Sequence, residues 1–418
     1  MRTLILSKSD ISSGAARAAM RLHRALVAAE IDSTMLVGNK RSDDWRVQGP
    51  TSTLQKVLAK IPAILDNIPT LFQQTTNPIN HSPAWLSGIS ARRINTFNAD
   101  VINLHWICGG FLSIEEVSKI NKPIVWTLHD MWAFCGAEHY VSDDQNARFR
   151  CGYSHCNRDP AHKGIDIDRW VWNRKQESWK NPVQIVTPSR WLADCVKGSA
   201  LMHNWPVTVI PNPLDTETFK PYSKQIAREM LGLPKDSKLV LFGALKGGSE
   251  PRKGWDLLQS ALVKVRQCVP GLHGVIFGQS EPQNPPDLGL PIHWLGHLDD
   301  DSKLALLYSA VDVTVLPSRQ ENLPQVGTEA QACGCPVVAF NITGLPDVVE
   351  HAMTGYLAEA FSIDDLAKGI EWVLSDDERY SKLSARSRER ARQLWSPEVV
   401  VPQYLKVYEL AKVTDIGL

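Results

Sequence analysis

Two glutamates in the last third of the chain are the residues best suited to hold a sugar. Glu321 stands in a loop that leaves the apolar run 311–318, and Glu329 lies eight positions further on, in a helical pattern. A carboxylate at the carboxyl end of a strand can accept two hydroxyl hydrogen bonds at once, as a ribose diol or a sugar ring would offer them. The spacing alone equally fits solvated acids at a helix start, so its weight depends on the neighbouring residues.

Basic and small residues elsewhere suit a phosphate. Arg252 and Lys253 precede a helical pattern and could neutralise the charge of a departing diphosphate; the alternative is an exposed basic pair. Gly14 follows Ser12 and Ser13 after the first apolar run and opens a helix. A small residue there lets backbone N–H groups approach an oxyanion.

His129 ends the apolar run 124–129, where a parallel sheet presents its ligand-binding edge. Either a packing role or contact with a ligand fits that position. A polar stretch follows that contains three cysteines and a histidine, which could form a tetrahedral zinc site from Cys135, His139, Cys151 and Cys156. Their spacings do not fit the usual zinc knuckles, so reduced cysteines or a local bridge are the alternatives. We assign no metal to the chemistry.

Short apolar runs alternate with helical patterns in two series, which predicts parallel sheets covered by helices. The expected strands are TLIL near the start, 101–106, 124–129, 185–189 and 207–212, and then 239–245, 274–278, 292–298, 311–318 and 336–340. The prolines of 211–221 break the alternation. We predict an α/β protein of two facing, doubly wound Rossmann-like domains, 1–212 and 213–395, with a helix over 396–418 that crosses back to the first domain.

Composition excludes several classes of protein. The 418 residues are 43% hydrophobic and 22% charged, with a formal net charge of zero, which argues against a disordered chain and against bulk attraction to nucleic acid. Residues 1–212 carry 24 basic and 18 acidic side chains, leaving 21 and 27 for the rest. That asymmetry favours closure of the two lobes on each other, or binding of an anionic partner by the first lobe. The alternative is random variation of the surface charge. Without a signal peptide or a long apolar run, we expect a cytoplasmic protein.

The segment 54–72 has apolar residues at near-helical spacing with Lys56 and Lys60 among them. Such a segment could lie on a membrane or cover a lipid acceptor. Because Pro62 and Pro69 interrupt it, a pair of short helices lining a cleft is the alternative.

The string from 317 to 358 resembles the nucleotide-sugar loop of family 4 retaining glycosyltransferases, which have the GT-B fold. Their signature is E-x7-E, then A-C-G-x-P-V-V, then G-x-P-[DE]-V-V. This chain has Glu321 and Glu329, then 332–338 as ACGCPVV, and then Gly344, Pro346, Asp347, Val348 and Val349. Similar strings occur around Gly14 and at 127–130, 187–195, 210–219 and 251–262, so the resemblance spans most of the chain.

The resemblance implies roles for individual residues. Glu321 would meet hydroxyls of the donor sugar, Glu329 the ribose of the nucleotide, and Arg252 and Lys253 the pyrophosphate. His129 would lie beside the donor sugar, and the Gly14 loop would lie over the pyrophosphate or near the acceptor.

One departure affects the sugar contacts. The usual loop reads E-G-F-G-L-P, whereas here Asn322, Leu323 and Pro324 follow Glu321. Asn322, through its side chain, and Leu323 would then take part in binding the donor.

The resemblance also implies partners. The donor would be a UDP- or GDP-sugar, with no other cofactor and no metal required, and the anomeric configuration would be retained. The acceptor would be a glycan or lipid-linked glycan of bacterial surface polysaccharide synthesis, with peripheral contact at the inner membrane. Two other functions fit the same architecture. A nucleotide-sugar 2-epimerase would turn over donor without acceptor, and a non-catalytic sugar- or nucleotide-binding protein would show no turnover.

Overall fold

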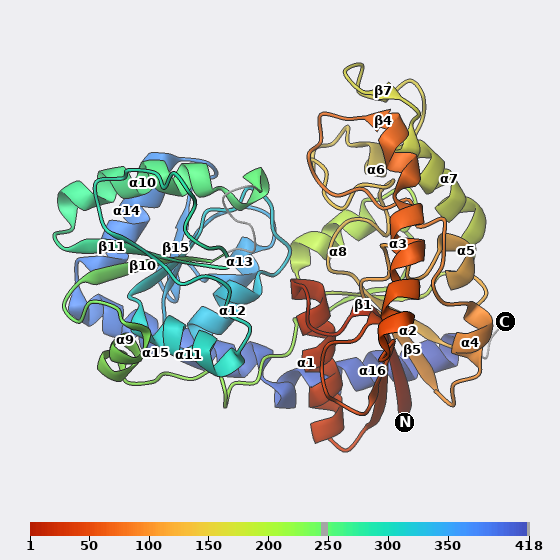
Figure 1. Ribbon diagram of the computed structural model, residues 1–418, viewed down its shortest axis with the longest axis horizontal. Coiled ribbons are helices and arrows are strands. Elements are labelled where there is room, and N and C mark those ends of the chain that lie inside the picture. Colours follow the sequence, from red (N-terminus) through yellow and green to blue (C-terminus); the bar gives the residue numbers. More distant parts are fainter. Residues whose placement is uncertain (244–249, 416–418) are drawn as a thin grey trace. The chain divides into compact units, whose positions relative to one another are not determined.

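The computed structural model describes residues 1–243 and 250–415. They form two compact units, which are described separately (Figure 1). Unit 1 contains Met1–Pro213 and the C-terminal stretch from Val400, and unit 2 contains Leu214–Val399. Within the described residues, no helix combines the length and apolar character that crossing a bilayer would need.

Unit 1 is built on a seven-stranded, fully parallel sheet with the strand order β3-β2-β1-β5-β6-β8-β9. Its strands are β1 (Arg2–Ser9), β2 (Asp32–Asn39), β3 (Val47–Gln48), β5 (Val101–Leu104), β6 (Ile124–Thr127), β8 (Gln184–Thr187) and β9 (Val207–Val209). A small antiparallel pair, β4 (Gln73–Gln74) and β7 (Lys163–Gly164), lies outside it.

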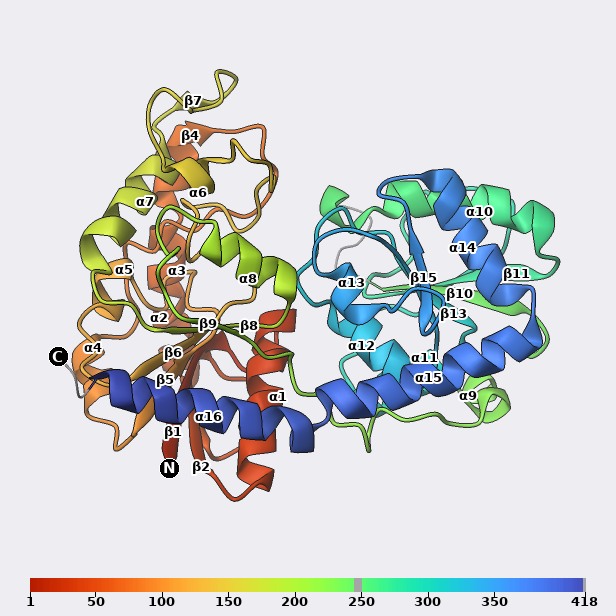
Figure 2. The ribbon, with the colours of Figure 1, turned by 180° about the vertical axis from the view of Figure 1, so that it is seen from behind.

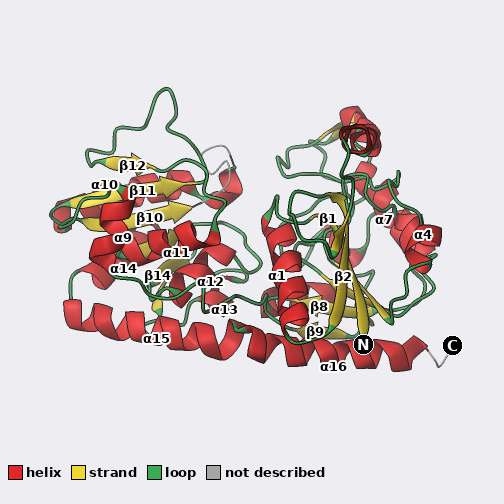
Figure 3. Ribbon diagram, turned by 60° about the horizontal axis from the view of Figure 1, so that its bottom comes forward, coloured by secondary structure: helices red, strands yellow, loops and turns green. Residues whose placement is uncertain are grey.

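The helices of unit 1 are mostly short. They are α1 (Gly14–Ala28), α2 (Thr53–Leu58), α3 (Lys60–Asp66), the 3₁₀ helix η1 (Ile68–Phe72), α4 (Ala91–Asn95), α5 (Ile114–Val117), α6 (Arg148–Cys151), α7 (Ile167–Ser178) and α8 (Arg190–Lys197). The long α1 packs along β1 and β2 (Figure 3). Its alanines at 16, 18 and 19 are buried, which allows the close approach of helix and sheet.

The helix α16 (Pro397–Asp415) completes the core of unit 1. Figure 2 shows it crossing the strands of that sheet. Tyr404 and Tyr408 are fully buried among Ile5, Val101 and Val125. The Tyr408 hydroxyl also accepts a hydrogen bond of 2.7 Å from the Asn103 amide, so its buried polar end is satisfied.

Unit 2 has a six-stranded parallel sheet with the strand order β12-β11-β10-β13-β14-β15. Its strands are β10 (Lys238–Gly243), β11 (Leu272–Phe277), β12 (Ile292–Trp294), β13 (Val313–Leu316), β14 (Val337–Phe340) and β15 (Gly355–Ala358). Its helices are α9 (Lys224–Leu231), the 3₁₀ helix η2 (Pro251–Lys253), α10 (Trp255–Cys268), α11 (Asp301–Ala310), α12 (Gln325–Ala332), α13 (Leu345–Val348), α14 (Ile363–Leu374) and α15 (Asp377–Trp395). The helices α10 and α14 cover one face, and α9 and α11 the other (Figure 1).

The predicted fold class is confirmed: both sheets are parallel and each is wrapped by helices. Two parts of the sequence analysis fall on residues outside the described ranges, namely the end of the expected strand 239–245 and the last residues of the helix 396–418. The strands β2, β3, β4, β7 and β15 had not been anticipated from the sequence.

Candidate functional site

The structure brings Glu321, Arg252 and Lys253 together at the carboxyl edge of the unit 2 sheet. Glu321 lies in the loop between β13 and α12, and its side chain is only 8% exposed. Its Oε1 accepts a hydrogen bond from Lys253 Nζ at 2.5 Å, and its Oε2 lies 3.3 Å from Arg252 Nη1. One carboxylate and two cations therefore share one small region.

The two cations determine the ionisation of Glu321. Burial acts to raise the pKa of Glu321, but Lys253 and Arg252 outweigh it and lower that pKa to about 2. The side chain is consequently a carboxylate throughout the neutral range, able to accept hydroxyl hydrogen bonds. Arg252 also pairs with Glu250 at 2.7 Å, which orients its guanidinium.

A tight turn places the basic pair. Gly254 has φ +69°, and a Cβ there would lie 1.9 Å from the Pro317 carbonyl oxygen, so only glycine fits between η2 and the Glu321 loop. Arg319 fastens the same two segments. Its guanidinium binds the Asp256 carboxylate at 2.6 and 2.9 Å and the Pro251 carbonyl at 2.7 Å. Arg319 could not be recognised from the sequence, since nothing in its local pattern points to a partner 63 residues away.

Glu329 lies on α12, and its side chain is buried. Its Oε2 accepts a 2.7 Å hydrogen bond from the Tyr308 hydroxyl of α11, a partner that the sequence did not reveal. Asn322 and Leu323 are buried as well. Their loop rests on the start of α13, where a Cβ on Gly344 would lie 1.5 Å from the Asn322 carbonyl oxygen.

In unit 1, His129 follows β6 and meets His105, which follows the neighbouring strand β5. His129 Nε2 and His105 Nδ1 are 2.9 Å apart, and the rings are stacked. Burial lowers the pKa of His129 to about 4, against a smaller raising effect of Asp130. Both the burial and the neighbouring His129 lower the pKa of His105. His129 is therefore a neutral imidazole at pH 7, suited to hydrogen bonding and not to charge neutralisation.

Asp130 organises the residues around His129. Its Oδ2 contacts His139 Nδ1 at 2.6 Å and accepts a hydrogen bond from Trp106 Nε1 at 3.0 Å. The other ring nitrogen of His139 lies 2.8 Å from Ser82 Oγ. Burial acts to raise the pKa of Asp130, but His139, the Trp132 backbone N–H and His129 together outweigh it and lower that pKa.

These contacts overturn the zinc alternative. Both ring nitrogens of His139 have hydrogen-bonding partners. Cys135 is buried, whereas Cys151 and Cys156 are exposed, and all three are free thiols. Across residues 1–243 and 250–415, no cluster of three or more His, Cys, Asp or Glu side chains is arranged to hold a metal. Asp130 and Ser82 occupy the two ring nitrogens of His139, and the exposed Cys151 and Cys156 do not share the buried position of Cys135.

Gly14 begins α1, capped by Ser13, whose Oγ accepts a hydrogen bond from Ala16 N at 3.3 Å. A Cβ on Gly14 would meet nothing within 4 Å, so packing does not require glycine and the space beside the helix start is open. Next to it, Asp10 accepts backbone hydrogen bonds from Arg41 and Ser42 at 2.8 to 3.1 Å, which fixes the loop after β2.

A basic cavity of about 790 Å³ lies at the carboxyl ends of β1 and β2. Five of its lining residues are cationic and one, Asp43, is acidic; the cations are Lys8, Lys40, Arg41, Lys56 and Lys60. Only Lys56 and Lys60 stood out in the sequence. The cavity gives unit 1 a place for an anionic group.

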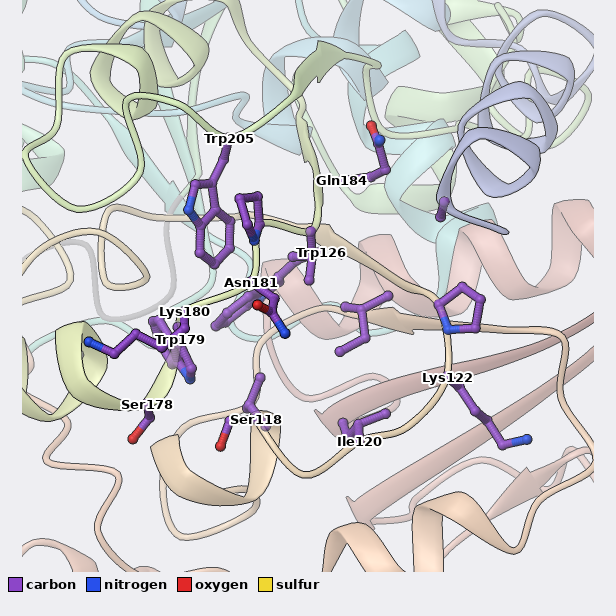
Figure 4. A pocket seen from close by; sticks show the side chains of 16 residues that line it. Ser118, Ile120, Lys122, Trp126, Ser178, Trp179, Lys180, Asn181, Gln184 and Trp205 are labelled. Carbon is purple, nitrogen blue, oxygen red and sulfur yellow. The ribbon is translucent and has the colours of Figure 1, made fainter. Parts of the chain in front are cut away.

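A second cavity, of about 180 Å³, lies at the amino ends of β6 and β8 in the same sheet (Figure 4). Lys122, Gln184 and Trp205 are among its lining residues, and none of the candidate residues is. Ligands of open parallel sheets bind at the carboxyl ends of the strands, which favours the basic cavity as a substrate site.

Two family models together match most of the chain. Residues 12–218 match the model described as Glycosyltransferase Family 4, and residues 223–390 match the one described as Glycosyl transferases group 1. Curated relatives include a D-inositol 3-phosphate glycosyltransferase of Thermobispora bispora, 33% identical over 71% of this chain and 68% of the relative. One from Mycolicibacterium smegmatis is 34% identical over 72% of this chain and 65% of its own length.

Solved structures share the fold at low identity. A sucrose-phosphate synthase from Thermosynechococcus elongatus has a TM-score of 0.65 and 18% identity, covering 98% of this chain and 99% of its own. Anabaena Alr3699/HepE in complex with UDP and glucose has a TM-score of 0.61 and 18% identity, with the same coverage. WaaG, a glycosyltransferase involved in lipopolysaccharide biosynthesis, has a TM-score of 0.61 and 15% identity, covering 95% and 97%.

Proposed function

The chain belongs to glycosyltransferase family 4, the group 1 glycosyl transferases with the GT-B fold, and on that premise we propose how its two units divide the reaction. It is an enzyme that uses a nucleotide-sugar donor. Unit 2 binds the donor and unit 1 binds the acceptor. The observation that carries this proposal is the pairing of Glu321 with Lys253 and Arg252 at the carboxyl edge of the unit 2 sheet.

Each member of that group has a separate task. The cations of Lys253 and Arg252 exchange part of their contact with Glu321 for contact with the donor diphosphate, whose charge grows as the glycosidic bond breaks. The freed oxygens of Glu321 accept hydrogen bonds from sugar hydroxyls, with the Asn322 side chain adding a contact. Glu329 binds the ribose hydroxyls of the nucleotide. No metal is required, because the two cations offset the diphosphate charge.

His129 contributes to the sugar from unit 1. As a neutral imidazole it hydrogen-bonds a hydroxyl of the donor sugar, while its backbone carbonyl faces the positive charge that develops at the anomeric carbon. The departing phosphate accepts the proton of the acceptor hydroxyl on the same face of the sugar, so the anomeric configuration is retained. The Gly14 loop supplies backbone N–H groups and open space near the phosphates or the acceptor.

We propose a UDP-hexose as the donor. The support comes from a fold relative whose structure holds UDP and glucose. A GDP-sugar is the alternative. The carboxylates of Glu321 and Glu329 and the cations of Arg252 and Lys253 recognise sugar hydroxyls, ribose and diphosphate, and they do not distinguish one base from another.

We further propose that the acceptor carries a phosphate. The five cations around the basic cavity suit such a group, and the curated relatives at 33 and 34% identity are D-inositol 3-phosphate glycosyltransferases. A glycan or lipid-linked glycan of surface polysaccharide synthesis is the second candidate. The exposed apolar side chains between Leu54 and Phe72 favour it, because they adjoin the same cavity.

The test is a panel of UDP- and GDP-sugars incubated with phosphorylated and unphosphorylated cyclitols and with a lipid-linked sugar. We expect a UDP-sugar to raise the melting temperature and a phosphorylated acceptor to receive the sugar in the donor's anomeric configuration. Conversion of the donor to an epimer without acceptor would identify an epimerase. A rise in melting temperature with a nucleotide sugar, but no turnover with any acceptor, would identify a binding protein.

A further inference from the structure

The segment that contains α2, α3 and η1 exposes an unusual amount of apolar surface. Leu54, Ile64 and Leu71 have exposed fractions of 68, 66 and 79%. We call the exposed apolar side chains of this segment the α2–η1 surface: Leu54, Val57, Leu58, Ile61, Ile64, Leu65, Ile68, Leu71 and Phe72. Of 23 exposed large hydrophobic residues in the described chain, nine belong to it. A concentration of this kind marks a surface that meets a partner.

The apolar side chains face outward because a buried acid fixes the segment. Asp66, at the end of α3, is fully buried, and its carboxylate accepts hydrogen bonds from the backbone N–H groups of Trp85 at 2.8 Å and Gly110 at 3.2 Å. A Cβ on Gly110 would lie 2.5 Å from Pro62, so α3 also packs directly on the backbone there. The usual burial of an amphipathic helix is thus reversed, with the polar residue inside and the apolar residues outside.

The surface extends along unit 1 and has basic neighbours. In Figure 1, α2 and α3 follow one another towards β4 and β7. Ile165, 51% exposed, adjoins the far end, where its N–H bonds to the Phe72 carbonyl. At the near end, Lys56 and Lys60 belong to the segment itself, and both line the basic cavity.

The charge around the α2–η1 surface is strongly positive. Besides Lys56 and Lys60, the cavity contributes Lys8, Lys40 and Arg41 against Asp43 alone. The one acid within 51–77 is Asp66, and it is buried. An apolar surface bordered by cations complements the anionic face of a phospholipid bilayer, where the apolar side chains enter the acyl boundary and the lysines reach the headgroups.

We propose that the α2–η1 surface docks unit 1 on an anionic phospholipid bilayer, lying in the plane of the interface. The inference shares the cations of the basic cavity with the proposed acceptor site. It requires no bound donor or acceptor, so vesicle binding and turnover test the two proposals separately. It would hold the basic cavity close to the headgroups.

The test is co-sedimentation of the full chain with vesicles of phosphatidylcholine containing about one third phosphatidylglycerol, against vesicles of phosphatidylcholine alone. We expect binding to the anionic vesicles. Ile64→Gln with Leu71→Gln should reduce the partition coefficient by roughly tenfold or more, because two large apolar side chains no longer enter the interface. Lys56→Glu with Lys60→Glu should reduce binding to the anionic vesicles by a similar factor, through loss of headgroup attraction.

The matched control is Ile226→Gln with Met230→Gln on α9, two apolar residues that are 59 and 66% exposed in unit 2. It should leave vesicle binding unchanged, and melting curves show whether each variant folds. The proposal is overturned if the wild-type protein binds neither kind of vesicle. It is also overturned if the Ile64→Gln, Leu71→Gln variant sediments with the vesicles like the wild type. A lipid-free dimer that this variant converts to a monomer overturns it as well, because a second copy would then cover the surface.

Discussion

Lys253 is the residue whose contribution to turnover and to folding can be separated most cleanly. Lys253→Ala should lower kcat about a hundredfold, because its interaction with the diphosphate strengthens as charge develops. Arg252 and Ser318 still contact Glu321 in the variant, so the melting temperature should change less. Steady-state kinetics and a melting curve measure both. The control is Lys264→Ala, which removes an exposed ion pair with Asp364. A large loss of stability with normal turnover would make Lys253 a structural residue.

Glu329 tests the nucleotide contact. Glu329→Gln should weaken UDP binding by roughly tenfold, the effect expected when a charged acceptor of a ribose hydrogen bond is lost. Because Glu329 also accepts the Tyr308 hydroxyl, Tyr308→Phe is the matched variant that removes only that internal bond. Calorimetric titration with UDP should show normal affinity for Tyr308→Phe. Equal losses in both variants would indicate that Glu329 acts by holding α11 against α12.

The ionisation of Glu321 predicts a pH dependence of stability. Its folded pKa of about 2 lies below its ordinary value of 4.5. A depressed pKa means that the unfolded state binds the proton more readily, so the stabilisation is complete above pH 4.5 and is lost as the pH falls towards 2. Glu321→Gln should therefore cost on the order of 3 kcal/mol near pH 7 and progressively less below pH 4.5. Urea unfolding of both proteins across this range measures the difference. A cost that does not vary with pH would refute the ionic pairing.

At the scale of elements, the turn between η2 and the Glu321 loop is a sharp test of how the site is built. Gly254→Ala adds both a strained φ and a methyl group 1.9 Å from the Pro317 carbonyl oxygen, so it should lower stability and turnover together. Gly271→Ala is the matched control, since Gly271 has φ +67° but open space around its Cβ. It should cost about 1 kcal/mol and leave turnover normal. Unfolding free energies and kcat that are equal for the two variants would contradict this account.

Sequence pattern predicts some elements of this chain better than others. The runs 101–106, 124–129 and 336–340 are rich in β-branched and other apolar residues, as is typical of buried parallel strands, and they contain β5, β6 and β14. Asp32–Asn39 escaped recognition because polar residues at both ends and a glycine dilute its apolar core. Gly355–Ala358 escaped it because it begins with a glycine and contains no β-branched residue.

Side-chain contacts between residues far apart in the sequence are the hardest to predict. The positions of Glu321 and His129 follow from strand ends, and that of Lys253 from the start of the helix after it. Arg319, Tyr308 and His105, in contrast, act through contacts with residues 63, 21 and 24 positions away. Those pairings arise only when the strands are ordered in a sheet. The zinc alternative failed for the same reason, since the contact between His139 and Asp130 is set by the fold of the loop after β6.

At the scale of the whole molecule, the candidate residues are divided between two units, each with its own parallel sheet. Glu321, Glu329, Arg252 and Lys253 belong to unit 2, and His129 and Gly14 to unit 1. The proposed reaction needs both units to reach one donor. A crystal structure of the protein with an unreactive UDP-hexose analogue is the most direct test. We expect Lys253 and Arg252 to contact the diphosphate, and Glu321 and His129 both to hydrogen-bond the same sugar. A bound sugar that Glu321 touches and His129 does not approach would contradict this expectation.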